Sequence, residues 1–179
     1  GHEAATVWLT GLTGGGKSTV AYALERKLFD EGRAYHVLDG GNLRLGVNKD
    51  LGFDADERAE NIRRAAEIAR MFNQAGMISI CALLSPYASE RERAKQIVGG
   101  GRFIEVYLAA SLETCRERAR NGLYGKAEAG EVKNFSGVSA PYEPPTAPDL
   151  VLSTDHLGVD ECVEKIIRLM EDRGVFGAR

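Results

Sequence analysis

A glycine-rich turn between an apolar run and a helical pattern constrains the fold of this chain more than any other feature of its sequence. Residues 11–18 read G-L-T-G-G-G-K-S and fit the pattern G-x-x-x-x-G-K-[ST]. The run 6–10 before the turn suits a buried strand, and residues 17–32 after it carry apolar side chains at helical spacing. The alternative is a flexible turn that precedes Lys-Ser by coincidence. The flanking strand and helix argue against that alternative.

The chemistry of this turn suits a phosphate group. Glycines let backbone N–H groups turn inward around phosphate oxygens, where a Cβ atom would obstruct both the turn and the approach. Lys17 supplies positive charge to the β- and γ-phosphates, and Ser18 offers a hydroxyl to Mg²⁺. The positive end of the following helix points at the anion. Residues Gly11–Ser18 therefore predict a site for a nucleoside triphosphate with magnesium.

The rest of the chain alternates strand patterns with helix patterns, which predicts an α/β fold with a parallel sheet and helices on both faces. Between residues 121 and 148 the periodicity vanishes, and glycines and prolines punctuate the stretch. A loop of this length is usually functional, so we expect a lid over an active site. We expect strands at 6–10, 35–38, 77–84, 103–108 and 150–152, and helices at 17–32, 56–75, 89–97, 111–120 and 159–173.

Length and charge limit the possible ligands. A chain of 179 residues is the size of one domain, and its net charge of -3 provides no basic field for a nucleic-acid backbone. A small phosphorylated substrate is favoured instead. We expect a single domain over 1–179, although the opening Gly1-His2 leaves open that the chain was cut from a longer protein.

The cysteines and the apolar runs bear on the compartment. Cys81, Cys115 and Cys162 are odd in number and widely spaced, which argues against a disulfide framework or a zinc site and favours a reducing cytoplasm. No stretch resembles a signal peptide or reaches the length of a transmembrane helix. We therefore expect a cytoplasmic protein without a membrane partner.

Asp39 follows the second expected strand, at the edge of the sheet where α/β proteins bind ligands. A carboxylate there can bind Mg²⁺ through water or orient an acceptor hydroxyl. The alternative is an aspartate that caps a turn before Gly40 and Gly41, which is common. The residues that follow favour the functional interpretation.

Several consecutive motifs resemble the adenylylsulfate kinase family of P-loop kinases over almost the whole chain. They are D-G-G-N-L-R-L-G-V-N-K-D-L-G-F at 39–53, D-E-R-A-E-N-I-R-R at 56–64, L-L-S-P-Y at 83–87, F-I-E-V-Y at 103–107 and the run 121–145. The resemblance implies a three-layer P-loop kinase fold with five parallel strands and a lid. It also implies transfer of the γ-phosphate of ATP to the 3′-hydroxyl of adenosine 5′-phosphosulfate, with Mg²⁺, in sulfate assimilation. A homodimer and an associated or fused ATP sulfurylase are the partners it suggests.

The resemblance also implies residue roles. Lys17 and Asp39 are the catalytic candidates, and Ser18 and Asp39 are the metal candidates. Forked guanidinium donors suit phosphate and sulfate, and phenylalanine faces suit a purine. The ATP positions are Gly11, Leu12, Thr13, Gly14, Gly15, Gly16, Lys17, Ser18 and Thr19, and the substrate positions are Gly41, Asn42, Arg44, Phe53, Arg58, Asn61, Leu84, Ser85, Asn121, Asn134 and Phe135.

Some of these residues have structural alternatives. Phe53 and Phe135 are core aromatics in the alternative interpretation, and Arg63 belongs to a solvated helix face. We accept the structural interpretation for Arg63 and reject it for Phe53, which lies within an irregular stretch.

Two of these positions depart from the family pattern. Gly41 stands where the family has the second aspartate of D-G-D-N, a residue often given the role of general base, and Asn121 stands where it has a lid lysine. Removing a general base typically lowers a rate about a hundredfold to ten-thousandfold. Phosphoryl transfer asks little of a base, so reduced activity is expected to survive. Asp39 acting through a water, and Arg120 beside the missing lysine, are candidate compensations.

These departures leave two alternatives to a working kinase. The first is a weakened nucleotide-binding domain that regulates or partners an ATP sulfurylase. The intact Lys17-Ser18 pair and the intact Arg44 and Arg58 oppose it. The second is another small-metabolite kinase on the same fold, which the motif at 121–145 disfavours.

Overall fold

A computed structural model describes residues 1–177 and contains one five-stranded sheet in the order β2-β3-β1-β4-β5. All four strand pairs are parallel, as the alternation of elements predicts. The strands are β1 (Thr6–Thr10), β2 (Tyr35–Asp39), β3 (Ile78–Ala82), β4 (Phe103–Ala109) and β5 (Leu150–Ser153).

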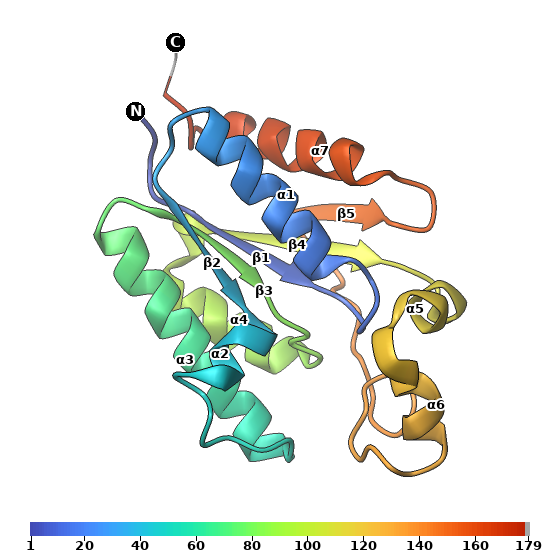
Figure 1. Ribbon diagram of the computed structural model, residues 1–179. Coiled ribbons are helices and arrows are strands. Elements are labelled where there is room, and N and C mark those ends of the chain that lie inside the picture. Colours follow the sequence, from blue (N-terminus) through green and yellow to red (C-terminus); the bar gives the residue numbers. More distant parts are fainter. Residues whose placement is uncertain (178–179) are drawn as a thin grey trace.

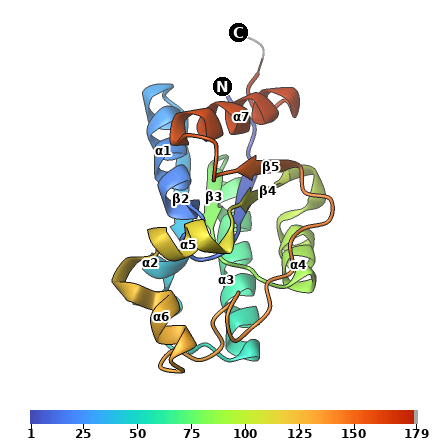
Figure 2. The ribbon, with the colours of Figure 1, turned by 90° about the vertical axis from the view of Figure 1, so that its right-hand side faces the viewer.

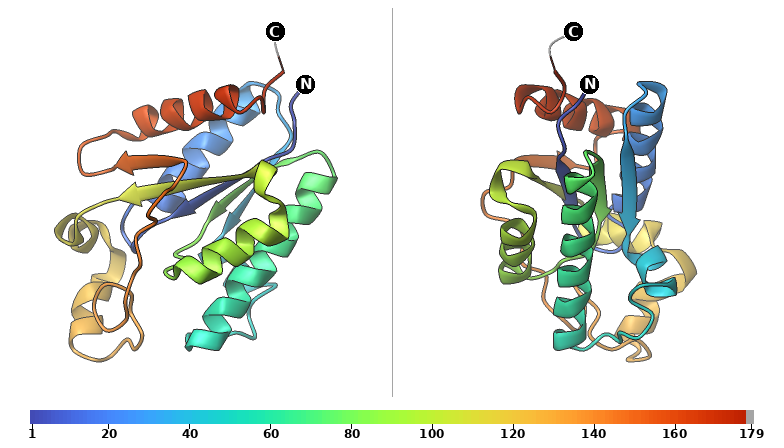
Figure 3. Two further views of the ribbon diagram at one scale, coloured as in Figure 1. Left: turned by 180° about the vertical axis from the view of Figure 1, so that it is seen from behind. Right: turned by 90° about the vertical axis from the view of Figure 1, so that its left-hand side faces the viewer.

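Helices cover both faces of the sheet, so the molecule has the three layers that the sequence predicts. Helices α1 and α7 lie on one face, and α3 and α4 lie on the other (Figures 1 and 3). The helices are α1 (Lys17–Asp30), α2 (Gly40–Leu45), α3 (Ala55–Gln74), α4 (Ala88–Val98), α5 (Leu112–Arg118), α6 (Leu123–Glu128) and α7 (Val159–Asp172), with 3-10 turns η1 (Gly100–Arg102) and η2 (Arg120–Gly122).

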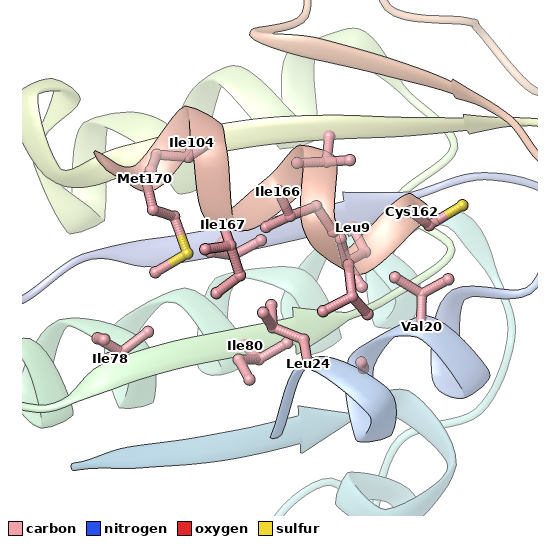
Figure 4. Close-up of a cluster of buried hydrophobic side chains, with 14 of the residues drawn as sticks. Leu9, Val20, Leu24, Ile78, Ile80, Ile104, Cys162, Ile166, Ile167 and Met170 are labelled. Atoms are coloured by element: carbon pink, nitrogen blue, oxygen red, sulfur yellow. The ribbon is translucent and has the colours of Figure 1, made fainter. Parts of the chain in front are cut away.

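The central strand β1 is buried along its whole length, which explains its continuous apolar sequence. Because side chains alternate along a strand, Val7 and Leu9 enter the core beneath α1 and α7, whereas Trp8 enters the core beneath α3 and α4. Figure 4 shows Leu9 beside Leu24 of α1 and Ile166 of α7. This packing fixes the direction in which β1 leaves the sheet.

All the strands end at the same edge of the sheet, and the segments after them gather there. Figures 1 and 2 show α2, α5, α6 and the returning chain before β5 at this edge. The turn at 11–16 follows β1, Asp39 ends β2, and residues 83–87 follow β3. The fold thus brings together the motifs that the sequence analysis singled out.

The sequence prediction differs from the structure in two irregular stretches. The stretch after β2 contains α2, whose N-terminus is capped by the Asp39 carboxylate. Residues 121–148, which we call the lid segment, contain the end of η2 and the six-residue helix α6. Both helices are too short for a periodic pattern to emerge, and glycines interrupt their sequences. In addition, the strand expected at 77–84 ends at Ala82, and the helix expected at 111–120 ends at Arg118.

Two further observations concern the cysteines and the apolar character of the helices. Cys81, Cys115 and Cys162 are all buried free thiols. Within residues 1–177, no helix combines the length and the apolar character needed to cross a membrane.

Candidate active site

One cavity of about 1270 Å³ lies at the carboxyl edge of the sheet. Its walls come from the turn after β1, the start of α2, the start of α3, the chain after β3 and the lid segment. The predicted site residues that line it are Thr13, Gly14, Gly16, Lys17, Ser18, Thr19, Asp39, Gly41, Arg44, Phe53, Arg58, Asn61, Leu84, Ser85, Asn134 and Phe135. The cavity lining does not include Gly11, Leu12, Gly15, Asn42 or Asn121.

The turn 11–16 requires glycine at Gly14 for two reasons. Its φ of +84° lies in the left-handed region, and a Cβ atom there would lie 2.3 Å from the carbonyl oxygen of Cys115 in α5. Thr154 supports the same turn, because its Oγ1 donates to the Gly15 carbonyl oxygen at 3.0 Å. Gly16 then leads directly into α1, so the helix N-terminus faces the cavity.

Lys17 lies folded over this turn. Its Nζ donates to the carbonyl oxygens of Gly11 at 2.7 Å and Leu12 at 2.9 Å. Burial lowers the pKa of Lys17 to about 8, although the nearby charge of Asp39 opposes that shift. A bound anion would favour the charged form further. The arrangement therefore provides a cation that can leave its carbonyl partners for a phosphate.

Ser18 and Asp39 place two oxygen ligands next to the turn. The Ser18 Oγ donates to Asp39 Oδ2 at 2.5 Å, while Asp39 Oδ1 accepts from the backbone N–H groups of Gly41 at 2.9 Å and Asn42 at 3.3 Å. Asp39 is thus a helix cap, as the structural alternative holds, and also a cavity residue. Hydroxyl and carboxylate oxygens are hard ligands that fit Mg²⁺.

A second wall combines an exposed aromatic ring with two guanidinium groups. Phe53 is 58% exposed, and the Cζ atoms of Arg44 and Arg58 lie 4.1 Å and 6.0 Å from its ring centroid. Burial lowers the pKa of both arginines, and the charge of Arg58 lowers the pKa of Arg44 further. Both groups still carry charge at neutral pH, because the ordinary pKa of an arginine lies roughly five units above neutrality. This wall suits an aromatic anion.

The lid segment supplies the opposite wall. Phe135 is buried and packs edge-on against Tyr124 with ring centroids 4.9 Å apart, yet it also lines the cavity. Arg58 donates to the carbonyl oxygen of Asn134 and, at 3.4 Å, to Ser136 Oγ. These bonds join the lid segment to α3 across the mouth of the cavity.

The remaining predicted residues differ in their surroundings. Asn61 is buried and accepts a hydrogen bond from Asn48, whereas Asn42 donates to the Tyr22 hydroxyl outside the lining. Asn121 has a left-handed φ of +60° within η2 and does not line the cavity. Gly41 lies in the wall beside Asp39 and brings no side chain to it.

Three cationic residues of the cavity are absent from the predicted set. Arg118, Arg120 and Lys133 all line it, and Arg118 also donates to the carbonyl oxygen of Thr154 at 2.8 Å. The signal available in the sequence was their position, since Arg118 and Arg120 directly precede the lid segment and Lys133 lies within it. Arg120, the candidate compensation for the missing lysine, faces the cavity while Asn121 does not.

Comparisons with known proteins agree with this geometry. The adenylyl-sulfate kinase of Geotalea uraniireducens is 47% identical over 179 residues, which cover 100% of this chain and 86% of that protein. The APS kinase of Mycobacterium tuberculosis, solved in complex with AMPPNP and APS, superposes with a TM-score of 0.91 at 42% identity and covers 96% of this chain and 99% of that one. A hexameric APS kinase from Thiobacillus denitrificans gives a TM-score of 0.74 at 29% identity, over 98% of this chain and 30% of that one.

The family assignment rests on most of the chain. Residues 3–153 match the family described as adenylylsulphate kinase, and this span includes the turn 11–18 and the lid segment. The sequence resemblance is therefore confirmed. This chain belongs to the adenylylsulphate kinase family of phosphotransferases.

Proposed function

We propose that this protein transfers the γ-phosphate of ATP to the 3′-hydroxyl of adenosine 5′-phosphosulfate and so makes 3′-phosphoadenylyl sulfate for sulfate assimilation. The observation that carries the proposal is the single cavity shared by the phosphate turn and the wall of Arg44, Arg58 and Phe53. Its volume of about 1270 Å³ exceeds the roughly 300–1,000 Å³ of a usual pocket for one small ligand. Donor and acceptor nucleotides would thus share one compartment.

The donor side of the cavity would bind ATP through residues Gly11–Thr19. The inward-facing N–H groups of the turn and the N-terminus of α1 suit phosphate oxygens, and Lys17 adds a mobile positive charge. The relative from Mycobacterium tuberculosis was solved with AMPPNP, an ATP analogue, which supports this assignment. Arg118 and Arg120 would add charge near the phosphates.

Magnesium would be held by the oxygens of Ser18 and Asp39 together with phosphate oxygens of ATP. Bound there, Mg²⁺ would neutralise charge on the transferred phosphoryl group. The Ser18 hydroxyl would then have to leave Asp39 Oδ2, its present partner.

The acceptor side would bind adenosine 5′-phosphosulfate. Phe53 and Phe135 would face the adenine from opposite walls, and Arg44 and Arg58 would give forked donors to the phosphosulfate group. APS is the second ligand of the Mycobacterium tuberculosis structure, which supports this pairing. The other substrate-side residues of the proposal are Gly41, Asn42, Asn61, Leu84, Ser85, Asn121 and Asn134.

Catalysis would depend on position and charge. The transition state of phosphoryl transfer is loose, so an aligned 3′-hydroxyl and the charge of Lys17 matter more than a strong base. Gly41 has no carboxylate. Among the carboxylates that line the cavity, Asp39 is the closest to Gly41 in sequence, so we propose that it takes the hydroxyl proton through a water. Its hydrogen bonds to Gly41 and Asn42 keep it at the end of β2.

The test is ADP release measured with and without adenosine 5′-phosphosulfate, for the wild-type chain and for Gly41→Asp. A working kinase releases ADP only with the acceptor, and comparable rates in the two proteins would refute the regulatory alternative. Turnover of Asp39→Asn, assayed in parallel, decides whether Asp39 takes part, since an unchanged rate would remove it from the mechanism.

The bare wall at Gly41 is the observation that favours the second candidate, a weakened domain that regulates or partners an ATP sulfurylase. That candidate predicts no acceptor-dependent ADP from the wild-type chain and recovery in Gly41→Asp.

We also propose a homodimer, in keeping with the hexameric relative, and a cytoplasmic location, in keeping with the free thiols.

A further inference from the structure

Arg91 of α4 is a buried charge outside the site described above. Arg91 is 2% exposed, and it does not line the cavity. Its Nη1 donates to the carbonyl oxygen of Ser85 at 2.7 Å, and its Nη2 donates to the carbonyl oxygen of Glu143 at 2.7 Å. Both hydrogen-bond partners are therefore backbone carbonyls rather than carboxylates.

A guanidinium in such surroundings is costly. Removing a charge from water carries a penalty, which the nearby charges of Glu90 and Glu105 and the Tyr142 ring, 5.9 Å from Arg91 Cζ, only partly offset. An apolar side chain at this position of α4 would avoid that penalty. The positions of its two carbonyl partners, in separate parts of the chain, point to a role beyond stability.

The first partner, Ser85, lies in the cavity wall in a conformation that needs support. Its φ of +38° is left-handed although the residue is not glycine, so its backbone is strained. Its hydroxyl accepts from Trp8 Nε1 at 3.1 Å, and its carbonyl oxygen accepts from Thr10 Oγ1 at 3.3 Å as well as from Arg91. Arg91 makes the shorter bond to that carbonyl.

The second partner, Glu143, lies where the lid segment returns to the sheet. Its N–H donates to the Pro86 carbonyl oxygen at 2.8 Å, and its Oε2 accepts from the Ala88 N–H at 2.7 Å. The neighbouring Tyr142 places its hydroxyl 3.0 Å from Thr10 Oγ1. One guanidinium therefore joins the wall at Ser85 to the base of the segment that carries Phe135.

We propose that Arg91 is a positioning residue for the acceptor nucleotide, acting through the carbonyl groups of Ser85 and Glu143. The inference rests on the proposed function, because both walls belong to the acceptor side. The phosphate turn has its own supports, since Thr154 bonds to Gly15 and Tyr124 bonds to Thr13. Loss of Arg91 should therefore weaken the acceptor and spare ATP.

The test compares Arg91→Met and Arg91→Lys with Arg93→Met, a matched change at an exposed arginine of the same helix. Small displacements of a positioned substrate lower rates up to about a hundredfold. We expect Arg91→Met to raise KM for adenosine 5′-phosphosulfate at least about tenfold and to change KM for ATP less than about twofold. Arg91→Lys keeps the charge without the fork, so its effect should be smaller but equally selective. Arg93→Met should match the wild-type protein.

Calorimetric titration with adenosine 5′-phosphosulfate and with AMPPNP provides the second readout. Equal weakening of both ligands, or a lower melting temperature with unchanged affinities, would overturn the role of Arg91. If Arg91→Met does not fold, the selectivity of Arg91→Lys decides. If the wild-type chain binds the acceptor without turnover, the proposed function is refuted, and the binding data still test the role of Arg91. If the wild-type chain does not bind the acceptor, the proposed function and the role of Arg91 are both refuted.

Discussion

The hydroxyl of Tyr124 donates a hydrogen bond to the carbonyl oxygen of Thr13 at 2.7 Å, which joins α6 of the lid segment to the phosphate turn. The same ring packs against Phe135, so one buried side chain contacts both the donor side and the acceptor side of the cavity. Burial raises the pKa of Tyr124 well above its usual range, so the hydroxyl stays protonated and remains a donor at neutral pH.

Removing this hydroxyl should loosen the phosphate turn. A typical hydrogen bond contributes about 1 kcal/mol, so Tyr124→Phe should raise KM for ATP about fivefold while the ring contact with Phe135 remains. Tyr35→Phe, at the start of β2, is the control and should leave both KM values unchanged. An unaltered KM for ATP in Tyr124→Phe would show that the bond does not support the turn.

A side chain at Gly14 should abolish the phosphate site. Both the left-handed φ and the 2.3 Å approach to the Cys115 carbonyl oppose a Cβ atom there. We expect Gly14→Ala to weaken AMPPNP binding more than about tenfold, since such backbone strain alone costs roughly 1–3 kcal/mol. Gly125→Ala is the matched control, because it lies within α6 with no neighbouring atom within 4 Å. That change should leave binding intact and raise the free energy of unfolding by up to about 1 kcal/mol.

Arg58 should matter for the acceptor far more than its neighbour Arg63. Arg58 contacts Phe53, Asn134 and Ser136 around the cavity, whereas Arg63 pairs with Glu60 on the outer face of α3. Loss of hydrogen bonds to a charged group costs about 1.5–3 kcal/mol, so Arg58→Ala should raise KM for adenosine 5′-phosphosulfate about ten- to a hundredfold. Arg63→Ala should change it little, because exposed ion pairs contribute about 0–1 kcal/mol. Similar KM values for the two variants would contradict the assignment of Arg58.

ATP binding should depend on the protonation of Lys17. Burial lowers its pKa from 10.5 to about 8, so the folded state binds fewer protons than the unfolded state between these values. The free energy of unfolding should therefore rise with pH across this window. A triphosphate favours the charged ammonium, so binding above pH 8 should take up a proton and weaken by at most about tenfold per pH unit.

Calorimetry of AMPPNP binding in buffers of different ionisation enthalpy measures that proton uptake. Lys17→Met supplies the comparison, since it removes the titrating group. Proton uptake of equal size in Lys17→Met and in the wild-type protein would assign the effect to another residue.

The elements that position the site are the predictable ones. The strand at Thr6–Thr10 and the turn after it follow from an uninterrupted buried run and from a loop whose residue types are set by phosphate chemistry. Phe53 lies outside the core, as its place within an irregular stretch of the sequence indicates. Helix α6 is not predictable in the same way, since its six residues bury only Tyr124 and Ala127.

The contacts that join separate parts of the chain depend on tertiary structure. Arg91 and Glu143 are 52 positions apart, and Tyr124 and Thr13 are 111 positions apart. No local pattern indicates which carbonyl a guanidinium or hydroxyl will find. The left-handed conformation of Ser85 is likewise imposed by its neighbours, because serine has no preference for it. The orientation of Arg120 toward the cavity also depends on tertiary structure.

Phosphoryl transfer is tested by following the transferred group itself. ATP with a radiolabelled γ-phosphate is mixed with excess protein, Mg²⁺ and adenosine 5′-phosphosulfate, and the products are separated after one turnover. We predict that the label moves to 3′-phosphoadenylyl sulfate in the wild-type chain and stays on ATP in Lys17→Met. Label that remains on ATP in a wild-type chain that binds both nucleotides would refute the proposed phosphoryl transfer.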